Sequence, residues 1–299
     1  ISQIVEQIAV AVVALLMANF MVHHFAGAGE DTLQRWSAAG ATIGTGAGVT
    51  AALLFMLFVY SVNRKTINRR IARDKVSVDE SYQQVMRNIV LIVAPIILSA
   101  FIYNVNGYIN GVMYTSISDF RGMDNSQVKV LYAEFGFFMT LINIPLTLAS
   151  TASTSMIPEF SAHYATGDVK GAIEKINNAT WISMLISMPA SVGLAVLAQP
   201  VTSLLFPSTE GVAGKLMVLG VITVILNSTS NISNGVLQGI GRANIPMINA
   251  AVSLAVDVVF LAVLLFFTNA GIYAVVIAMI VYAIVMCVLN DRALKKYLG

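Results

Sequence analysis

The stretch that decides the fold is residues 88–114, NIVLIVAPIILSAFIYNVNGYINGVMY. Its first half is an apolar run that contains Pro95, and its second half places Asn104, Asn106 and Asn110 among apolar neighbours. About 20 apolar residues are enough for a helix to cross a bilayer. Asparagine is costly in hydrocarbon unless a partner or water satisfies its amide. The stretch therefore predicts a membrane helix that has a polar face.

The composition of the whole chain also indicates a membrane protein. Of its 299 residues, 57% are hydrophobic and 11% are charged, whereas soluble domains carry about 25% charged residues. We predict an all-α, polytopic membrane protein with eight transmembrane helices. Because the apolar pattern is already present at Ile1, we expect the chain to be part of a longer protein. The apolar segments are residues 1–22, 37–60, 87–116, 129–157, 177–198, 215–239, 245–267 and 271–290.

The longest connection, residues 61–86, is rich in lysine and arginine, for example in RRIAR at 69–73. A nucleic-acid patch is one interpretation, but the positive-inside rule favours a cytoplasmic loop, part of which lies along the membrane surface. We therefore expect three parts and no nucleic-acid partner. They are the end of an N-terminal transmembrane lobe (1–60), a cytoplasmic basic amphipathic linker (61–86) and a C-terminal transmembrane lobe (87–299).

Alternating the sides of the membrane from this linker tests the orientation. Thirteen of the 17 lysines and arginines then fall on the cytoplasmic side, and Arg35, Arg121, Lys129 and Lys215 fall outside. This asymmetry supports both the helix count and the orientation.

Three of the predicted helices carry a polar stripe at helical spacing. On a helical wheel, Asn104 lies well away from the first stripe, and Glu134 points away from the second, close to the outer end. The stripes are Tyr103, Asn106, Asn110 and Tyr114; then Gly136, Thr140, Asn143, Thr147, Ser150, Thr151 and Thr154; then Thr223, Asn227, Ser230, Asn231, Asn234 and Gln238.

Two interpretations of the stripes remain open. Small and polar residues are common interhelical contacts in membranes, and any single Ser or Thr fits that role. Stripes along three helices are better explained by a water-accessible cavity that suits sugars or polar head groups. The candidate cavity and substrate-binding residues are Tyr103, Asn106, Asn110, Thr140, Asn143, Thr147, Asn227, Asn234 and Gln238.

Charged residues within the apolar segments are candidates for ion coupling or gating. Asp257 lies at the centre of one segment, SLAVDVVFLAV, and Glu6 lies in the first segment. An intramembrane carboxylate is a functional candidate by default, as a proton carrier, a Na⁺ ligand or the partner of a cation. A carboxyl group paired with a neighbouring Asn or Tyr is the structural alternative for Asp257, and Glu6 could lie at an interface.

The other motifs in the sequence give little evidence of function. Gly40, Gly44 and Gly48 recur every four residues, which predicts close helix packing rather than a nucleotide-binding loop. The single cysteine, Cys287, and three scattered histidines give no metal-ligand pattern. We find no catalytic triad, zinc motif or phosphate loop, so we expect neither an enzyme nor a bound metal or cofactor, apart from a coupling ion, Na⁺ or H⁺.

Four stretches, in order, resemble one family. They are APIILSAFIYNVNGYIN (94–110), LINIPLTLASTASTSMIPEFSAHYATGD (141–168), SMPASVGLAVLAQPVTSLLF (187–206) and NISNGVLQGIGRANIPMINAAVSL (231–254). They resemble the polysaccharide and lipid-linked-sugar flippases of the multidrug/oligosaccharidyl-lipid/polysaccharide exporter superfamily. Within it the chain is most similar to the stage V sporulation protein B-like group, which is related to the lipid II flippase.

The resemblance implies a transporter of about fourteen helices in two lobes, which works by alternating access. It further implies a lipid-linked oligosaccharide or peptidoglycan precursor as substrate, the bacterial cytoplasmic membrane as location and coupling to an ion or to the membrane potential. We expect a monomer surrounded by membrane lipids. A cation-coupled multidrug antiporter of the same superfamily and a membrane protein without transport activity remain alternatives.

Overall fold

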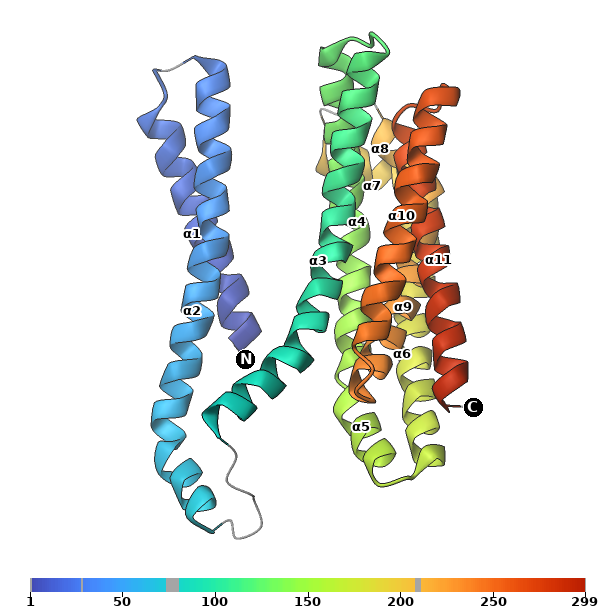
Figure 1. Cartoon of the computed structure of the whole chain (residues 1–299). Helices are drawn as coiled ribbons and strands as arrows, with labels where there is room; N and C mark the ends of the chain where they lie inside the picture. Colours follow the sequence, from blue (N-terminus) through green and yellow to red (C-terminus); the bar gives the residue numbers. More distant parts are fainter. Residues whose placement is uncertain (1, 28, 74–80, 208–210, 299) are drawn as a thin grey trace. The chain divides into compact units, whose positions relative to one another are not determined.

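The computed structural model describes residues 2–27, 29–73, 81–207 and 211–298, and these residues form α-helices and no strands. Figure 1 shows the helices along the chain. Their bounds are α1 (Ser2–His24), α2 (Glu30–Arg73), α3 (Tyr82–Phe120), α4 (Asn125–Thr154), α5 (Ile157–Ala165), α6 (Val169–Val196), α7 (Ala198–Leu205), α8 (Val212–Gly220), α9 (Ile222–Gly239), α10 (Asn244–Phe267) and α11 (Ile272–Leu298).

Six of the described helices are long and apolar enough to cross a membrane, and the bent pair α8 and α9 makes a seventh if it is one span. The all-helical prediction is thus confirmed, and the chain is a multi-pass membrane protein. The count of eight stays a prediction, because the apolar part of α1 among the described residues, Ile8–His24, is shorter than a full span.

The chain divides into two compact units, Ile1–Glu80 and Ser81–Gly299. Of the expected linker 61–86, residues 61–73 continue α2 as a helix, residues 82–86 open α3, and residues 74–80 lie outside the described residues. Ser81 caps α3: its Oγ accepts a hydrogen bond from the Gln84 N–H (3.3 Å), and the Gln84 Oε1 accepts one from the Ser81 N–H (3.0 Å). This capping box fixes where α3 begins.

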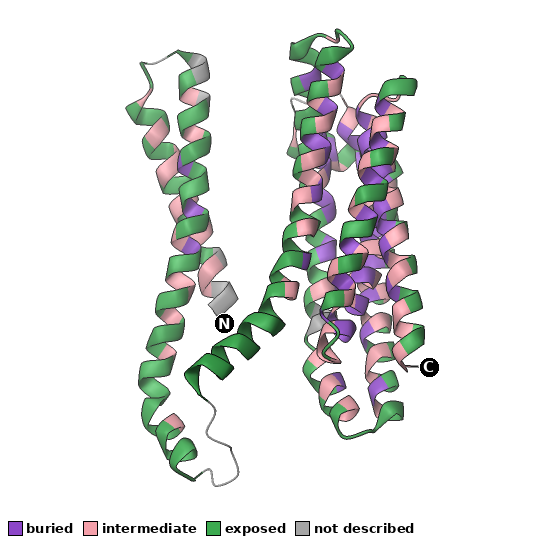
Figure 2. Ribbon diagram, in the orientation of Figure 1, coloured by how far each residue is buried: buried purple, intermediate pink, exposed green. Residues whose placement is uncertain are grey.

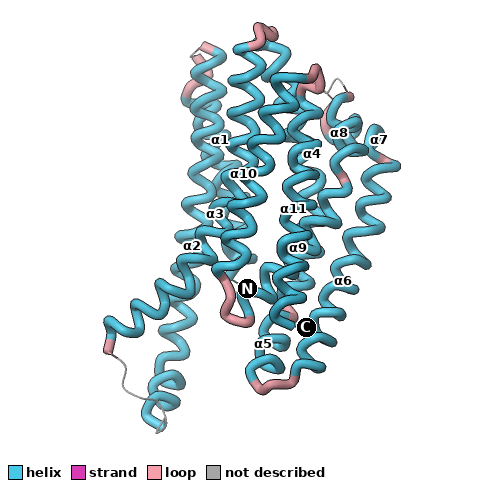
Figure 3. The backbone as a smooth tube through the Cα atoms, turned by 45° about the vertical axis from the view of Figure 1, so that its right-hand side comes forward, coloured by secondary structure: helices cyan, strands magenta, loops and turns pink. Residues whose placement is uncertain are grey.

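The first unit is the pair α1 and α2, which lie side by side (Figures 1 and 3). Gly40, Gly44 and Gly48 are buried on α2 and face α1. A Cβ on Gly44 would lie 2.6–2.8 Å from the Cβ, N and Cα atoms of Ala14. The glycines thus allow the two backbones to approach closely, as the spacing predicts.

The second unit is a bundle in which α10 packs on α3 and α11, and α4 packs on α6 and α9. Figure 2 shows its buried residues gathered between these helices. One apolar cluster surrounds Phe138, Leu216 and Leu261, and a second surrounds Phe160 and Val236.

The polar interior residues lie between these two clusters along the helices. On α10 the first cluster reaches Leu261, and Asp257, Ser253 and Asn249 follow at successive turns towards the start of the helix. All three belong to the face that packs on α3 and α11, because Asp257 contacts α3 while Ser253 and Asn249 contact α11. The fold therefore encloses a polar layer between two apolar ones.

The predicted single helix 215–239 is wrong, because the structure breaks it at Val221 into α8 and α9, bent by 46°. The Thr223 Oγ1 donates a hydrogen bond to the Gly220 carbonyl (2.6 Å), so a carbonyl at the break is satisfied. Gly220 has no side chain and lies directly against the Phe138 ring. A glycine in tight contact followed by β-branched residues accounts for the bend at this point.

Candidate functional site

The centre of the polar layer is a buried carboxylate held by an amide. Asp257 on α10 is fully buried. The Asn106 Nδ2 on α3 donates a hydrogen bond to its Oδ2 (2.8 Å), and Asn106 is itself 6% exposed. The Asp257 Oδ1 is also buried and has no partner among the described residues. A carboxylate with one unsatisfied oxygen in a membrane interior can accept a proton or a cation.

Two further polar side chains surround this carboxylate. Asn110 lies one turn after Asn106, is fully buried and lies close to the Asp257 carboxyl group. Neither its Nδ2 nor its Oδ1 has a hydrogen-bond partner among the described residues. The Tyr282 hydroxyl on α11 is likewise buried without a described partner. The Tyr282 ring lies 6.3 Å from the ring of Tyr103, centroid to centroid. The cluster thus collects oxygen and amide groups from α3, α10 and α11.

A cavity of about 170 Å³ opens beside this cluster. It brings together four of the residues that the polar stripes predicted, from α3, α4 and α9: Tyr103, Asn106, Asn143 and Asn227. Tyr282 also lines it. The stripes of three separate helices therefore converge on one space in the structure.

A larger cavity of about 440 Å³ is lined by residues of α3, α4, α5, α9, α10 and α11. Of the predicted residues it is lined by Tyr103, Asn234 and Gln238, and Asn231 and Ser150 contribute as well. Asn104 lines both cavities, although the helical wheel separates it from the stripe. A wheel locates residues on one helix only, so it could not reveal that a cavity reaches round this side of α3.

Three amides form a ladder across the bundle. The Asn249 Nδ2 on α10 donates to the Asn290 Oδ1 on α11 (2.8 Å). The Asn290 Nδ2 donates in turn to the Asn234 Oδ1 on α9 (2.8 Å). Asn290 is fully buried and was missed by the sequence analysis, where it stood at the last position of an apolar segment. Its only signal was an amide two residues before Arg292, where the basic end of the chain begins.

Some predicted residues lie away from both cavities. Thr140 and Thr147 are exposed on α4 and donate to carbonyls of their own helix, at 2.9 and 2.7 Å. Asn110 faces Asp257 but lines neither cavity. Glu6 belongs to the first unit, where its backbone oxygen and side chain lie opposite Gly48 on α2.

Glu134, which the wheel places away from the polar stripe, is buried and lines neither cavity. Its Oε2 accepts a hydrogen bond from the Ala213 N–H (2.6 Å) at the start of α8. A carboxylate at a helix N-terminus satisfies free N–H groups and is favoured by the helix dipole. We therefore assign Glu134 to holding α8 in place rather than to the cavities.

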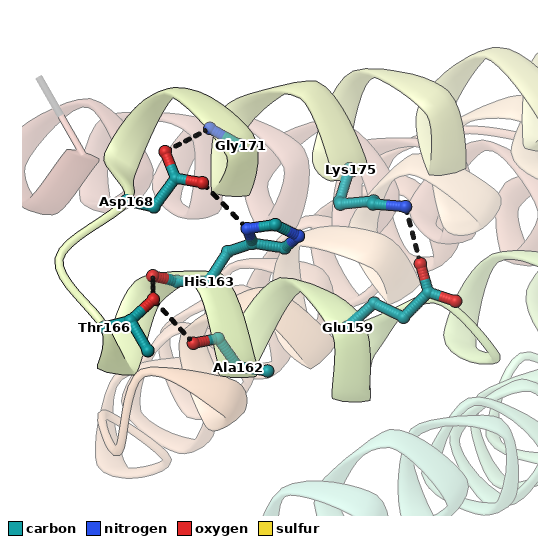
Figure 4. A network of polar contacts seen from close by, with 7 residues as sticks. All are labelled: Glu159, Ala162, His163, Thr166, Asp168, Gly171 and Lys175. Carbon is teal, nitrogen blue, oxygen red and sulfur yellow. Dashed lines mark hydrogen bonds and ion pairs between the residues drawn. The ribbon is translucent and has the colours of Figure 1, made fainter.

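A second polar network lies at the turn between α5 and α6, outside the cavities (Figure 4). Asp168 caps α6 through the Gly171 N–H (3.0 Å) and contacts the His163 Nδ1 (2.8 Å), and both interactions lower the pKa of its carboxyl group. The Lys175 Nζ donates to Glu159 (2.6 Å), which lowers the pKa of Glu159. Glu159 and Asp168 are exposed and His163 and Lys175 are half-buried, so the network fixes a surface turn.

Comparison with known proteins gives consistent results. Residues 129–264 match the MatE family. Lipid II flippase MurJ of Bacillus subtilis (strain 168) is 22% identical over 268 residues, which are 87% of this chain and 47% of that protein. Stage V sporulation protein B of the same organism is 22% identical over 299 residues, 99% of this chain and 55% of that protein. The chain thus spans about half the length of these relatives.

Solved structures have the same fold. An outward-facing multidrug resistance MATE family transporter of the MOP superfamily aligns with a TM-score of 0.70 and 14% identity, covering 98% of this chain and 61% of that one. A MATE P26A mutant aligns with a TM-score of 0.66 and 18% identity, covering 97% and 62%. The matched region, the named relatives and the shared fold confirm the resemblance seen in the sequence. Residues 129–264 of this chain thus match the MatE family, and the chain is similar along most of its length to proteins named lipid II flippase MurJ and stage V sporulation protein B.

Proposed function

We propose that this chain is part of a transporter that flips a lipid-linked oligosaccharide or peptidoglycan precursor across the bacterial cytoplasmic membrane by alternating access. The observation that carries the proposal is the buried Asp257–Asn106 pair beside amide-lined cavities inside a membrane bundle. The names of the relatives, lipid II flippase and stage V sporulation protein B, support this class of substrate.

The chemistry of the cavity walls supports a glycan. Among the described residues that line the two cavities, none is charged; the polar ones carry amides and hydroxyls. These groups both donate and accept hydrogen bonds, as sugar hydroxyls do. A diphosphate prefers arginine or lysine, so we assign the sugar part of the substrate to this unit and expect the cationic contacts elsewhere in the protein.

Asp257 is the group we assign to coupling. Its buried Oδ1 without a described partner fits a proton, and together with the nearby Asn106 and Asn110 amides it also fits Na⁺, which binds oxygen ligands. Occupation of this position changes the charge between α3 and α10, the two helices that the Asn106–Asp257 bond joins. Glu6 remains a second candidate in the first unit.

The first experiment is rescue of a bacterium depleted of its lipid II flippase by the full-length protein. The assay measures lipid II accessible at the outer face of the membrane. We expect rescue by the wild type, and at least tenfold lower flipping by Asp257→Asn and Asp257→Leu at equal membrane expression. Asp291→Asn is the matched control, because Asp291 is exposed and pairs with Lys295 at the end of α11.

Each outcome bears on a separate part of the proposal. Normal flipping by both Asp257 variants removes the coupling role. Failure of the well-expressed wild type rules out lipid II as the substrate and favours another polymer precursor. The alternative is a cation-coupled multidrug antiporter, supported by the uncompensated acid at Asp257, and it predicts efflux of cationic dyes from the same cells.

The remaining parts of the proposal concern topology. We propose that residues 61–86 face the cytoplasm, that the whole protein has about fourteen helices in two lobes, and that it works as a monomer. Cysteine labelling of positions 64 and 121 from either side of the membrane tests the orientation, since we expect Arg64 inside and Arg121 outside.

A further inference from the structure

The 440 Å³ cavity has a fixed hydrogen-bonding pattern. The Asn290 Nδ2 donates a hydrogen bond to the Asn234 Oδ1 and so orients the Asn234 amide. The Nδ2 of Asn234 is then available to donate into the cavity. The Asn231 Nδ2 donates to the Ser150 Oγ (2.8 Å), so the Oδ1 of Asn231 is left to accept. Because Asn231 and Asn234 are three residues apart on α9, the donor and the acceptor lie on adjacent turns of one face.

The rest of the wall combines apolar and hydroxyl groups. Ile96 and Ala100 on α3 and Met286 on α11 supply an apolar surface. Ser99, which is 7% exposed, and Gln238 add polar groups at the edge. A volume of about 440 Å³ lies in the lower part of the range that holds small ligands. A ring with an apolar face and hydroxyl groups on its edge matches this wall.

The cavity is also separate from the carboxylate. Asp257 does not line it, and none of the described residues that do is charged. Burying an ionised group against such a wall leaves the charge without a partner, which is costly. The wall therefore discriminates against charged ligands and favours neutral ones.

We propose that this cavity is a subsite for one uncharged pyranose ring, held by the Asn234 Nδ2 and the Asn231 Oδ1, with Asn290 as the positioning residue that sets the orientation of Asn234. The proposal rests on the proposed function and specifies which part of the substrate this unit binds. The ring contacts the apolar wall with one face and directs a hydroxyl to each of the two amides.

The test uses methyl β-glucoside as probe and methyl β-glucuronide, the same ring with a carboxylate, as comparator. Binding to the full-length protein in lipid nanodiscs, without any glycoside detergent, is measured by saturation-transfer NMR. We expect the glucoside to bind and the glucuronide to bind at least tenfold more weakly. Equal binding of both sugars, or of neither, overturns the proposal.

Variants locate the binding to the cavity. We expect Asn234→Leu to weaken glucoside binding about three- to tenfold, the loss of one hydrogen bond. Asn234→Asp keeps the size and still accepts from Asn290, but it cannot donate, so we expect the same loss. Asn178→Leu, the same change on the exposed face of α6, is the matched control and leaves binding unchanged. Glucoside binding that is unaffected by both Asn234 variants refutes the site.

Rescue of the flippase-depleted strain is scored in parallel, so that two failures are distinguishable. Rescue together with no glucoside signal overturns the subsite and leaves the proposed function intact. A glucoside signal that Asn234→Leu weakens, without rescue, supports the subsite and counts against lipid II as substrate. An unfolding midpoint within a few degrees of wild type is required of each variant, so that lost binding is not lost folding.

Discussion

The contact between α1 and α2 gives the sharpest stability prediction, for Gly44→Ala. The added Cβ would lie 2.6 Å from the Ala14 Cβ and 2.8 Å from the Ala14 Cα, where ordinary contacts need 3.4–4 Å. Two of the three clashing atoms belong to backbone, so the helices must move apart. Overpacking of this kind costs about 1–3 kcal/mol, and the better helix propensity of alanine returns up to about 1 kcal/mol.

Gly46→Ala is the matched control, because Gly46 is exposed on the same helix and a Cβ there meets nothing within 4 Å. Both variants gain the same helix propensity, so the difference between their free energies of unfolding isolates the contact with α1. Trp36, which stacks on Phe25 at a centroid distance of 5.1 Å, reports the unfolding of this pair by fluorescence once Trp181 is replaced by phenylalanine. We expect Gly44→Ala to be the less stable variant by about 1–3 kcal/mol, and equal stabilities would refute the close packing.

Three further predictions concern the second unit. Glu134→Leu leaves the Ala213 N–H buried without its acceptor and should destabilise the protein by about 1–3 kcal/mol, whereas Glu134→Gln keeps an acceptor and should cost less in the same denaturation assay. Arg121 donates hydrogen bonds to the carbonyls of Leu265 and Thr268 at the end of α10 and to the Asn269 side chain. Arg121→Ala should therefore lower the free energy of unfolding by about 1 kcal/mol and speed amide hydrogen exchange at that helix end. The pKa of Asp168 is lower in the folded than in the unfolded protein, so the stabilisation that Asp168 contributes is complete above the unfolded-state pKa and is lost as the pH falls through the folded pKa. The unfolding midpoint should therefore drop on acidification. Asp168→Asn should make that drop smaller.

Much of the fold could be predicted because hydrophobicity and helical periodicity are local properties of the sequence. The segment 87–116 lies within α3, and 245–267 lies within α10. The break at Val221 could not be predicted in this way, since it depends on Gly220 meeting the Phe138 ring from another helix.

The candidate site was predictable in part for the same reason. Periodicity selected Asn106 and Asn234, because each lies on a stripe of its own helix. It could not select Asn290, which is a single amide in an apolar helix and acquires its role only from partners on α9 and α10. It also could not assign a role to Glu134, since a helical wheel gives the direction of a side chain but not the α8 N–H that it meets there.

The amide ladder of Asn234, Asn290 and Asn249 joins α9, α10 and α11 without using a charged group. An amide carries no net charge and does not titrate in the physiological range, so neither a pH gradient nor a voltage acts directly on the three amides of the ladder. Of the buried carboxylates in the described residues, Glu134 caps α8, and Asp257 joins α10 to α3. Under the coupling role proposed for Asp257, electrochemical work enters this bundle at the contact between α3 and α10, whereas the uncharged ladder links α9, α10 and α11.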